Sequence, residues 1–352
     1  MQRTFFPVSA DPITNWEVNA VNKLKQKFDK VVVGIENNET YTFTLEERLD
    51  MAKKCLTDVE IVTVKGYPED FAAENNMHVL AVAYRHYDEH KWERIKKCYS
   101  LGLDVFIQTG DYLLERITTD YVKTLQQDYK DVVKFVPLYV KQKLEEKISK
   151  QYIIGVTGEI ASGKTFLCNE LNDLARLNSV RYHHVNLDVV AKNVLYANKQ
   201  LIGKTFGTYL VENGRLNVKK LAEIVFSDKM QLEKLNTVMK DPILKEIKKE
   251  LKTKQGIITL DGALIVDHNI TYLCNNNVVL INVDRATQEE RLKQRGLTKS
   301  QAVARLNSQD CFKLKKFKLE EKIKKDNYGK IFNGNVEPSI LFNQILDYFH
   351  LR

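Results

Sequence analysis

Residues 152–165 constrain the fold of this chain more than any other stretch. They read Tyr-Ile-Ile-Gly-Val-Thr-Gly-Glu-Ile-Ala-Ser-Gly-Lys-Thr, an apolar run followed by Gly158, four residues, Gly163, Lys164 and Thr165. This spacing fills the Walker A pattern, in which glycines let the backbone close round a phosphate and point its amides inward. A chance glycine-rich loop is the alternative. The β-prone run before the loop and the amphipathic helix pattern after it favour a nucleotide-binding loop.

Each part of this loop has an expected task. Lys164 can reach the β- and γ-phosphates of a nucleotide, and the hydroxyl of Thr165 can bind Mg²⁺. The residues expected to hold ATP are those of the loop and of the first helical turn after it, Gly158, Glu159, Ile160, Ala161, Ser162, Gly163, Lys164, Thr165 and Phe166.

Composition limits the remaining possibilities. A length of 352 residues suggests two domains, and 43% hydrophobic content is enough for ordinary cores. Five scattered cysteines without CxxC spacing argue for a reducing cytoplasm, with no disulfide framework and no zinc site. The net charge of +8 is not gathered into one arm, so it favours phosphorylated ligands over nucleic acid. Neither a membrane span nor a signal peptide is expected, and the oligomeric state stays open.

The first half alternates strand and helix patterns, which predicts a doubly wound parallel sheet. The predicted strands are residues 5–8, 31–35, 61–64, 79–84 and 103–107, and the predicted helices are 17–28, 44–56, 70–75 and 89–100. His86, Asp88 and His90 fall at the head of the last helix. We interpret them as solvated surface residues rather than metal ligands.

Four sequence stretches of this half resemble phosphopantetheine adenylyltransferase, a nucleotidyltransferase of Rossmann-like fold. They are Ser9-Ala10-Asp11-Pro12-Ile13-Thr14-Asn15, Phe43-Thr44-Leu45-Glu46-Glu47-Arg48, Arg85, and Ile117-Thr118-Thr119. The resemblance covers most of residues 5–147.

Several positions depart from that family. Glu17 replaces a histidine that donates to the nucleotide phosphates, and Glu39-Thr40 replaces a lysine. Val8 replaces a glycine, Val82 an arginine, and Lys123 another arginine. A carboxylate cannot donate to a phosphate and repels it. We therefore expect residues 1–150 to form an adenylyltransferase-like domain that has lost its activity.

The pattern of residues 137–150 predicts a helix with a charged face, and no Gly/Ser or Pro-rich spacer follows it. We expect the domain boundary between residues 149 and 151 and two domains held close together. The second domain would then span residues 151–352.

The second half also predicts a parallel α/β sheet, here with the P-loop after its first strand. After residues 152–156, the predicted strands are 182–185, 257–260 and 277–283; the predicted helices are 189–196, 218–226, 229–251, 287–294, 299–306 and 340–349. Basic helices late in the chain are typical of a small-molecule kinase with a lid.

Nearly all of residues 151–349 resembles dephospho-CoA kinase. Besides the P-loop, the matching stretches are Asn186-Leu187-Asp188-Val189-Val190-Ala191-Lys192, Phe206-Gly207, Asn213-Gly214-Arg215-Leu216-Asn217, Val225-Phe226, Leu235-Asn236, Arg291 to Arg295, Arg305-Leu306-Asn307-Ser308-Gln309 and Ile331-Phe332-Asn333-Gly334. The resemblance implies transfer of phosphate from ATP, with Mg²⁺, to the ribose 3′-hydroxyl of dephospho-CoA. It also implies that Asn333 contributes to the nucleotide site.

The same resemblance assigns Asp188 as the base that accepts the hydroxyl proton; the alternative is a helix N-cap. Arg291 and Arg295, four apart on one helix face, would stabilise the transferring phosphoryl group; the alternative is a solvated face paired with Glu289 and Glu290. The basic residues 313–325 either extend the lid or form an exposed lysine-rich helix.

Departures from the family pattern keep other functions open. Asn186, Val218 and Asp241 replace an aspartate, an arginine and a histidine, and Glu159 replaces a glycine near the phosphates. One alternative is a P-loop kinase for another small acceptor, such as a nucleoside. Another is a non-catalytic pseudoenzyme that binds CoA-like ligands or a partner protein. The intact Lys164, Thr165 and Asp188 favour an active kinase.

Overall fold

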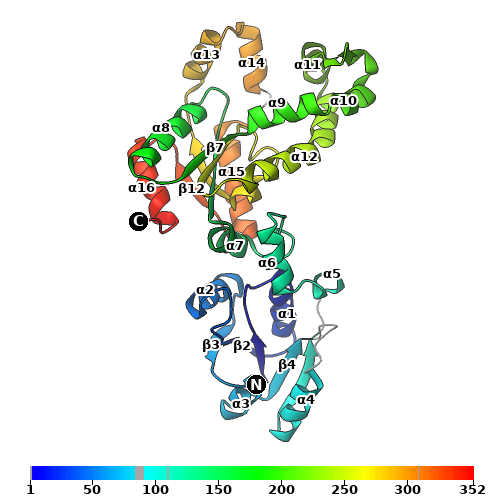
Figure 1. Cartoon of the computed structure of the whole chain (residues 1–352), viewed down its shortest axis with the longest axis vertical. Helices are drawn as coiled ribbons and strands as arrows, with labels where there is room; N and C mark the ends of the chain where they lie inside the picture. Colours follow the sequence, from blue (N-terminus) through cyan, green and yellow to red (C-terminus); the bar gives the residue numbers. More distant parts are fainter. Residues whose placement is uncertain (1, 84–90, 109–110, 308) are drawn as a thin grey trace. The chain divides into compact units, whose positions relative to one another are not determined.

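The computed structural model describes residues 2–83, 91–108, 111–307 and 309–352. Tyr84 at the end of a predicted strand, Glu89 at the start of a predicted helix, Arg85, the trio His86, Asp88 and His90, and Ser308 lie outside this range. The chain divides into two compact units, Met1–Ser149 and Lys150–Arg352, each with its own sheet (Figure 1). Every helix in the described part of the chain is too short or too polar to cross a membrane.

The first unit is built on a parallel sheet of strand order β3-β2-β1-β4-β5. Its strands are β1 (Arg3–Val8), β2 (Lys30–Glu36), β3 (Glu60–Val64), β4 (Val79–Ala83) and β5 (Asp104–Gln108). Neighbouring residues of a strand point to opposite faces of the sheet, so Phe5 and Phe6 of β1 enter different cores. Phe6 joins one core cluster and Phe5 the other.

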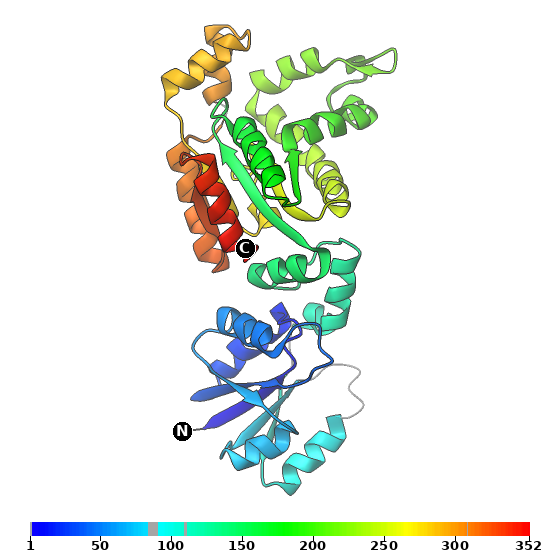
Figure 2. The same ribbon diagram turned by 60° about the vertical axis from the view of Figure 1, so that its left-hand side comes forward.

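Helices cover both faces of this sheet, seen from a second direction in Figure 2. One face carries α1 (Asn15–Lys25), α2 (Leu45–Cys55), α6 (Thr119–Gln127) and α7 (Leu138–Leu144). The other carries α3 (Pro68–Glu74) and α4 (Lys91–Ser100). A short α5 (Tyr112–Glu115) follows β5. The helix predicted over 137–150 is α7 continued by a π-helical turn, η1 (Glu145–Ser149).

The second unit has a parallel sheet of order β12-β11-β6-β10-β7, with the P-loop strand at its centre. Its strands are β6 (Gln151–Gly158), β7 (Tyr182–Asn186), β10 (Gly256–Asp261), β11 (Asn277–Ile281) and β12 (Lys330–Asn333). The consecutive residues Ile153 and Ile154 of β6 enter different cores, one on each side of the sheet. The predicted doubly wound parallel α/β class is therefore confirmed for both units.

Two helices cover one face of this sheet, α8 (Lys164–Leu177) and α16 (Pro338–Tyr348). The opposite face packs against α9 (Leu187–Ala197), α10 (Lys199–Phe206), α11 (Val218–Ser227), α12 (Lys229–Lys252), η3 (Thr271–Cys274) and α15 (Phe312–Asp326). Strand β12, helix α10 and the turn η3 were not predicted from the sequence.

A small hairpin precedes α11. It pairs β8 (Val211–Glu212) with β9 (Arg215–Leu216) after the 3₁₀ turn η2 (Thr208–Leu210). Asn213 and Gly214 both have positive φ, which the tight turn of a two-residue hairpin requires. Two further helices, α13 (Arg285–Gln294) and α14 (Lys299–Asn307), form a satellite cluster against the P-loop.

Candidate active site

The P-loop connects β6 to α8 with backbone geometry that only glycine permits at two positions. A Cβ atom on Gly158 would lie 2.5 Å from the carbonyl oxygen of Ile281 on the neighbouring strand. Gly163, which caps α8, has a φ of 100° in the left-handed region. The sequence pattern therefore corresponds to a real constraint: the backbone turns tightly here, directly before the positive end of a helix.

Lys164 is buried inside this loop. Its Nζ donates to the carbonyl oxygens of Glu159, at 3.0 Å, and Gly158, at 3.3 Å. Burial lowers the pKa of Lys164, while the charges of Asp261 and Asp188 oppose that shift. The three groups are thus close enough to interact electrostatically, around the position where the terminal phosphates of a nucleotide would lie.

Thr165 is held by an aspartate that sequence analysis had passed over. The Thr165 hydroxyl donates to Oδ2 of Asp261 at 2.7 Å. Asp261 is the last residue of β10, is 3% exposed, and pairs in register with Asn186 of β7. A signal was present in the sequence, because Asp261 ends an apolar run whose carboxyl end meets that of the P-loop strand.

Asn186, at the end of strand β7, and Asp188, two residues later, have different roles. Asn186 is the N-cap of α9, since its Oδ1 accepts from the amide of Val189 at 3.0 Å. The capping alternative for Asp188 is therefore wrong. The Asn186 amide also points at Asp261, with Nδ2 lying 3.4 Å from Oδ2. An aspartate at position 186 would place a second carboxylate there and repel Asp261.

Asp188 occupies the first turn of α9 with one side open to solvent. Desolvation by the surrounding protein raises the pKa of its carboxyl above 3.8, the Asp261 charge adds to the rise, and Lys164 opposes it. A carboxylate with a raised pKa beside a buried lysine is a candidate proton acceptor.

Arg291 lies against the P-loop. Its Nη1 donates to the carbonyl oxygen of Ala161 at 2.9 Å. The solvated-face alternative pairs Arg291 with Glu289 and Glu290, but both glutamates bind other residues of α13. Glu289 pairs with Arg285 at 3.1 Å, and Glu290 accepts from Gln294 at 3.2 Å. The solvated-face alternative is therefore wrong for Arg291. Arg295 is the exposed C-cap of α13, and its charge acts on Lys164.

Helices α13 and α14 are attached to the P-loop by a small apolar cluster. Ala161 of the loop packs with Leu292, Ala302 and Leu306, and Ile160 packs against the edge of this group. The side chain of Gln309 also accepts from the amide of Ile160 at 3.1 Å. This arrangement brings arginines to the phosphate-binding loop, as a kinase lid would.

Helix α15 corresponds to the basic stretch 313–325. Most of its side chains are exposed, as the alternative of an exposed lysine-rich helix expects, but one face is buried. Leu319 is fully buried in the core of the second unit. Lys315 is also fully buried, where it donates to the carbonyl oxygen of Ala263 at 2.8 Å and forms an ion pair with Asp267. One face of the helix therefore packs on the core, and the lysines of the opposite face lie at the surface.

The remaining predicted nucleotide ligands have local roles in this structure. Phe166 is exposed in the first turn of α8, and the amide of Ser162 donates to the carbonyl oxygen of Glu159 at 3.2 Å. Asn333 ends β12 at the sheet edge, and its Oδ1 accepts from the amide of Asn335 at 3.0 Å. The structure thus places Asn333 two strands away from β6.

In the first unit, the polar residues that match the adenylyltransferase pattern bind one another. The amide of Thr14 donates to the Glu17 carboxylate at 2.9 Å, and the Thr14 hydroxyl donates to the same oxygen. Glu17 is 5% exposed and completes the capping box of α1. Asp11 accepts from Lys123 at 2.8 Å and from the amides of Thr42 and Phe43.

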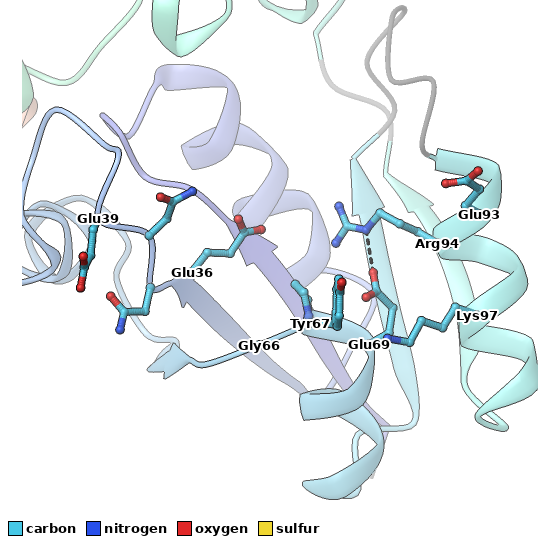
Figure 3. A pocket seen from close by; sticks show the side chains of 11 residues that line it. Glu36, Glu39, Gly66, Tyr67, Glu69, Glu93, Arg94 and Lys97 are labelled. Atoms are coloured by element: carbon cyan, nitrogen blue, oxygen red, sulfur yellow. Dashed lines mark hydrogen bonds and ion pairs between the residues drawn. The ribbon is translucent and has the colours of Figure 1, made fainter.

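A pocket of about 1020 Å³ opens at the carboxyl edge of the first unit's sheet (Figure 3). Among the described residues that line it, Glu36, Glu39 and Glu93 are acidic, and Arg94 and Lys97 are basic. Arg94 pairs with Glu69 and Lys97 with Asp70, both at 2.7 Å. The described part of the lining therefore carries more negative than positive charge, which disfavours a phosphorylated ligand there.

Comparison with known proteins finds a matching family model for each half of the chain. A dephospho-CoA kinase family model matches residues 152–328, and a cytidylyltransferase-like model matches residues 5–156. The dephospho-CoA kinase of Carboxydothermus hydrogenoformans is 32% identical over 193 residues, 51% of this chain and 87% of that protein. The enzyme of the same name from Listeria innocua is 28% identical over 196 residues, 53% of this chain and 90% of that protein.

The first half has a named relative of its own. The phosphopantetheine adenylyltransferase of Petrotoga mobilis is 29% identical over 155 residues, 42% of this chain and 96% of that protein. The fold and the P-loop with its lid define a kinase that uses ATP. The chain belongs to the dephospho-CoA kinase family, and it carries an N-terminal cytidylyltransferase-like domain. Both predicted resemblances are confirmed.

Two arginines of α13 offer a matched test of the lid. Arg291→Ala should lower kcat by roughly 10²–10³-fold, the usual loss when one preorganised donor to the reacting group is removed. Arg285→Ala should change kcat by less than about twofold, because Arg285 pairs with Glu289 at the surface. Steady-state phosphoryl transfer at saturating ATP measures both. Equal losses in the two variants would contradict the role assigned to Arg291.

Proposed function

We propose that this chain transfers the γ-phosphate of ATP to the ribose 3′-hydroxyl of dephospho-CoA, and that its first unit no longer transfers adenylyl groups. One observation carries the kinase proposal. Lys164, Thr165, Asp261 and Asp188 come from three different elements and interact at one edge of one sheet. That edge is where open α/β sheets bind their ligands.

The residues divide the reaction between them. The loop amides and Lys164 would cradle the phosphates, and Arg291 and Arg295 would stabilise the charge on the transferring group. Asp188 would accept the proton of the ribose hydroxyl as that oxygen attacks phosphorus.

The Thr165 hydroxyl and the Asp261 carboxylate are hard oxygen donors of the kind that Mg²⁺ prefers, and they already lie 2.7 Å apart. A P-loop threonine and an aspartate at the end of a neighbouring strand are the usual protein holders of this ion. When bound, Mg²⁺ would neutralise charge on the phosphate oxygens. The residues present therefore fit the ion.

The internal bonds of the first unit support the loss of adenylyl transfer. A nucleotide needs donors at its phosphates, yet the Thr14 hydroxyl and amide donate to the buried Glu17. Lys123, at the position of a family arginine, neutralises Asp11 and also pairs with Asp120. Glu39, at the position of a family lysine, adds negative charge to the pocket.

Product analysis tests the acceptor directly. With ATP and Mg²⁺, the protein should convert dephospho-CoA into a product heavier by one phosphate, and Lys164→Ala should abolish the reaction because the phosphates lose their fixed cation. Lys53→Ala, an exposed lysine of the first unit, is the control and should retain full activity. Product from a nucleoside panel alone would identify another acceptor. Silence with every acceptor would favour a non-catalytic binding protein.

The Asp188→Asn variant distinguishes a general base from a residue that binds the nucleotide or its metal. Turnover should fall by roughly 10²–10⁴-fold while ATP affinity stays close to wild type. In the wild-type protein the rate should fall as the pH drops through the raised pKa of Asp188, because only the carboxylate accepts a proton. That acid limb should disappear in the variant. If the variant binds ATP poorly but turns over normally at saturation, Asp188 holds the nucleotide or its metal instead.

Adenylyl transfer is tested on the Lys164→Ala protein, in which the kinase unit is silent. Removing one transition-state donor costs about 3 kcal/mol, and a carboxylate in its place adds repulsion. The losses need not add, but a rate reduction beyond roughly six orders of magnitude is expected. Pyrophosphate release from ATP and 4′-phosphopantetheine is the measurement. Steady release at ordinary enzymatic rates, sensitive to Glu17→Ala, would show that this unit has rebuilt its site.

A further inference from the structure

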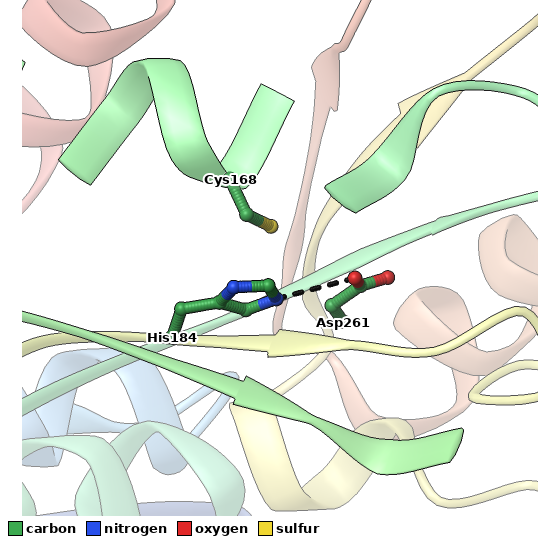
Figure 4. Close-up of side chains that lie close together, drawn as sticks. All are labelled: Cys168, His184 and Asp261. Atoms are coloured by element: carbon green, nitrogen blue, oxygen red, sulfur yellow. Dashed lines mark hydrogen bonds and ion pairs between the residues drawn. The ribbon is translucent and has the colours of Figure 1, made fainter. Parts of the chain in front are cut away.

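A cysteine, a histidine and an aspartate converge beneath the P-loop from three elements. Cys168 lies on α8, His184 on β7 and Asp261 at the end of β10 (Figure 4). Their ligand atoms, one sulfur, one ring nitrogen and one carboxylate oxygen, all lie within 4.8 Å of one another. The sequence predicted no zinc site, because the cysteines lack CxxC spacing. That spacing does not show which distant residues the fold brings together.

We propose that this cluster binds Zn²⁺ or a similar soft divalent ion, and that binding there competes with Mg²⁺ for Asp261. Zinc takes sulfur, imidazole nitrogen and carboxylate oxygen together, whereas Mg²⁺ requires oxygen ligands. The donor set therefore distinguishes the two ions.

The geometry is close to what zinc needs. Ligand atoms at 2.0–2.3 Å from a tetrahedral ion lie about 3.3–3.8 Å apart, so atoms that start within 4.8 Å of one another must approach by roughly 1.5 Å at most. His184 Nε2 is already 3.2 Å from Asp261 Oδ2. The His184 side chain keeps 20% of its surface exposed, whereas Cys168 and Asp261 are buried, so an ion would have to enter past His184. A water molecule would complete the coordination.

Binding has a defined chemical balance. The Cys168 thiol loses its proton to solvent and becomes a thiolate ligand. The neutral ring of His184 carries its proton on Nδ1 and coordinates through Nε2, which gives up its 3.2 Å contact with Asp261. Asp261 turns its Oδ2 from the Thr165 hydroxyl to the ion, so the 2.7 Å hydrogen bond between these residues is lost. The Mg²⁺ site proposed above uses the same two residues. Zinc in this cluster would therefore inhibit the kinase; the inhibition rests on the proposed function, but the binding itself does not.

Metal binding is tested on the nucleotide-free, Mg²⁺-free protein with Co²⁺ as the probe. A thiolate ligand gives Co²⁺ a charge-transfer absorption in the near ultraviolet, so titration should reveal one such site per chain, bleached by Zn²⁺. Cys168→Ser and Cys168→Ala should both abolish the band. Cys311→Ser, which changes the exposed cysteine before α15, should retain it. Circular dichroism confirms that each variant is folded.

A second measurement tests the competition. Buffered Zn²⁺ should inhibit phosphoryl transfer, and rising Mg²⁺ should relieve the inhibition. In Cys168→Ala, the Zn²⁺ concentration that halves the zinc-free rate of that variant should be at least about tenfold higher than in the wild type. A wild-type protein without the Co²⁺ band, or a band that persists in both Cys168 variants, overturns the site. Inhibition of equal strength in Cys168→Ala overturns the competition. A protein without kinase activity would sink the proposed function and leave the absorption result to decide the site.

Discussion

The candidate site depends on the hydrogen bond from Thr165 to Asp261, because this bond connects the P-loop helix to the neighbouring strand. Thr165 belongs to the P-loop helix, and Asp261 ends the strand that pairs with the P-loop strand. The same carboxylate contacts His184 and Asn186 of β7, and its charge acts on Lys164 and Asp188. A buried carboxylate needs partners of this kind, since an uncompensated one would be too costly to bury. The proposed Mg²⁺ site and the proposed base Asp188 would thus both depend on the carboxylate of Asp261.

The two units show opposite outcomes of the same physical requirement. Both place polar side chains at the carboxyl edge of a parallel sheet, and both must satisfy them. In the second unit Lys164 donates to main-chain carbonyls of the P-loop, and Arg291 lies against the same loop. In the first unit Glu17 takes the donors of Thr14 and Lys123 takes the charge of Asp11. That internal pairing stabilises the start of α1 and leaves fewer donors for the phosphates of a nucleotide, as the proposed loss of adenylyl transfer requires.

Much of this architecture was predictable because its signals are local. The alternation of Phe5 with Phe6, the cap of α2 at Thr44 and the P-loop glycines each depend on residues close in sequence. The contacts between distant residues were not predictable. The apolar run before Asp261 places it at a strand end, but nothing near it in the sequence shows that it binds Thr165, 96 residues earlier. The burial of Lys315 in a lysine-rich helix has no local signature either. Asn186 caps α9 in place of Asp188, because the helix begins two residues earlier than its apolar spacing indicates.

The central claim is that one chain with two nucleotide-binding folds has one working nucleotide site, at the P-loop. Counting bound ATP tests it most directly. Equilibrium dialysis of MgATP against the full chain should give one site per chain, and that site should be lost in Thr165→Ala and unaffected in Thr14→Ala. Two sites per chain, or a single site that depends on Thr14 and survives the change at Thr165, would contradict the account.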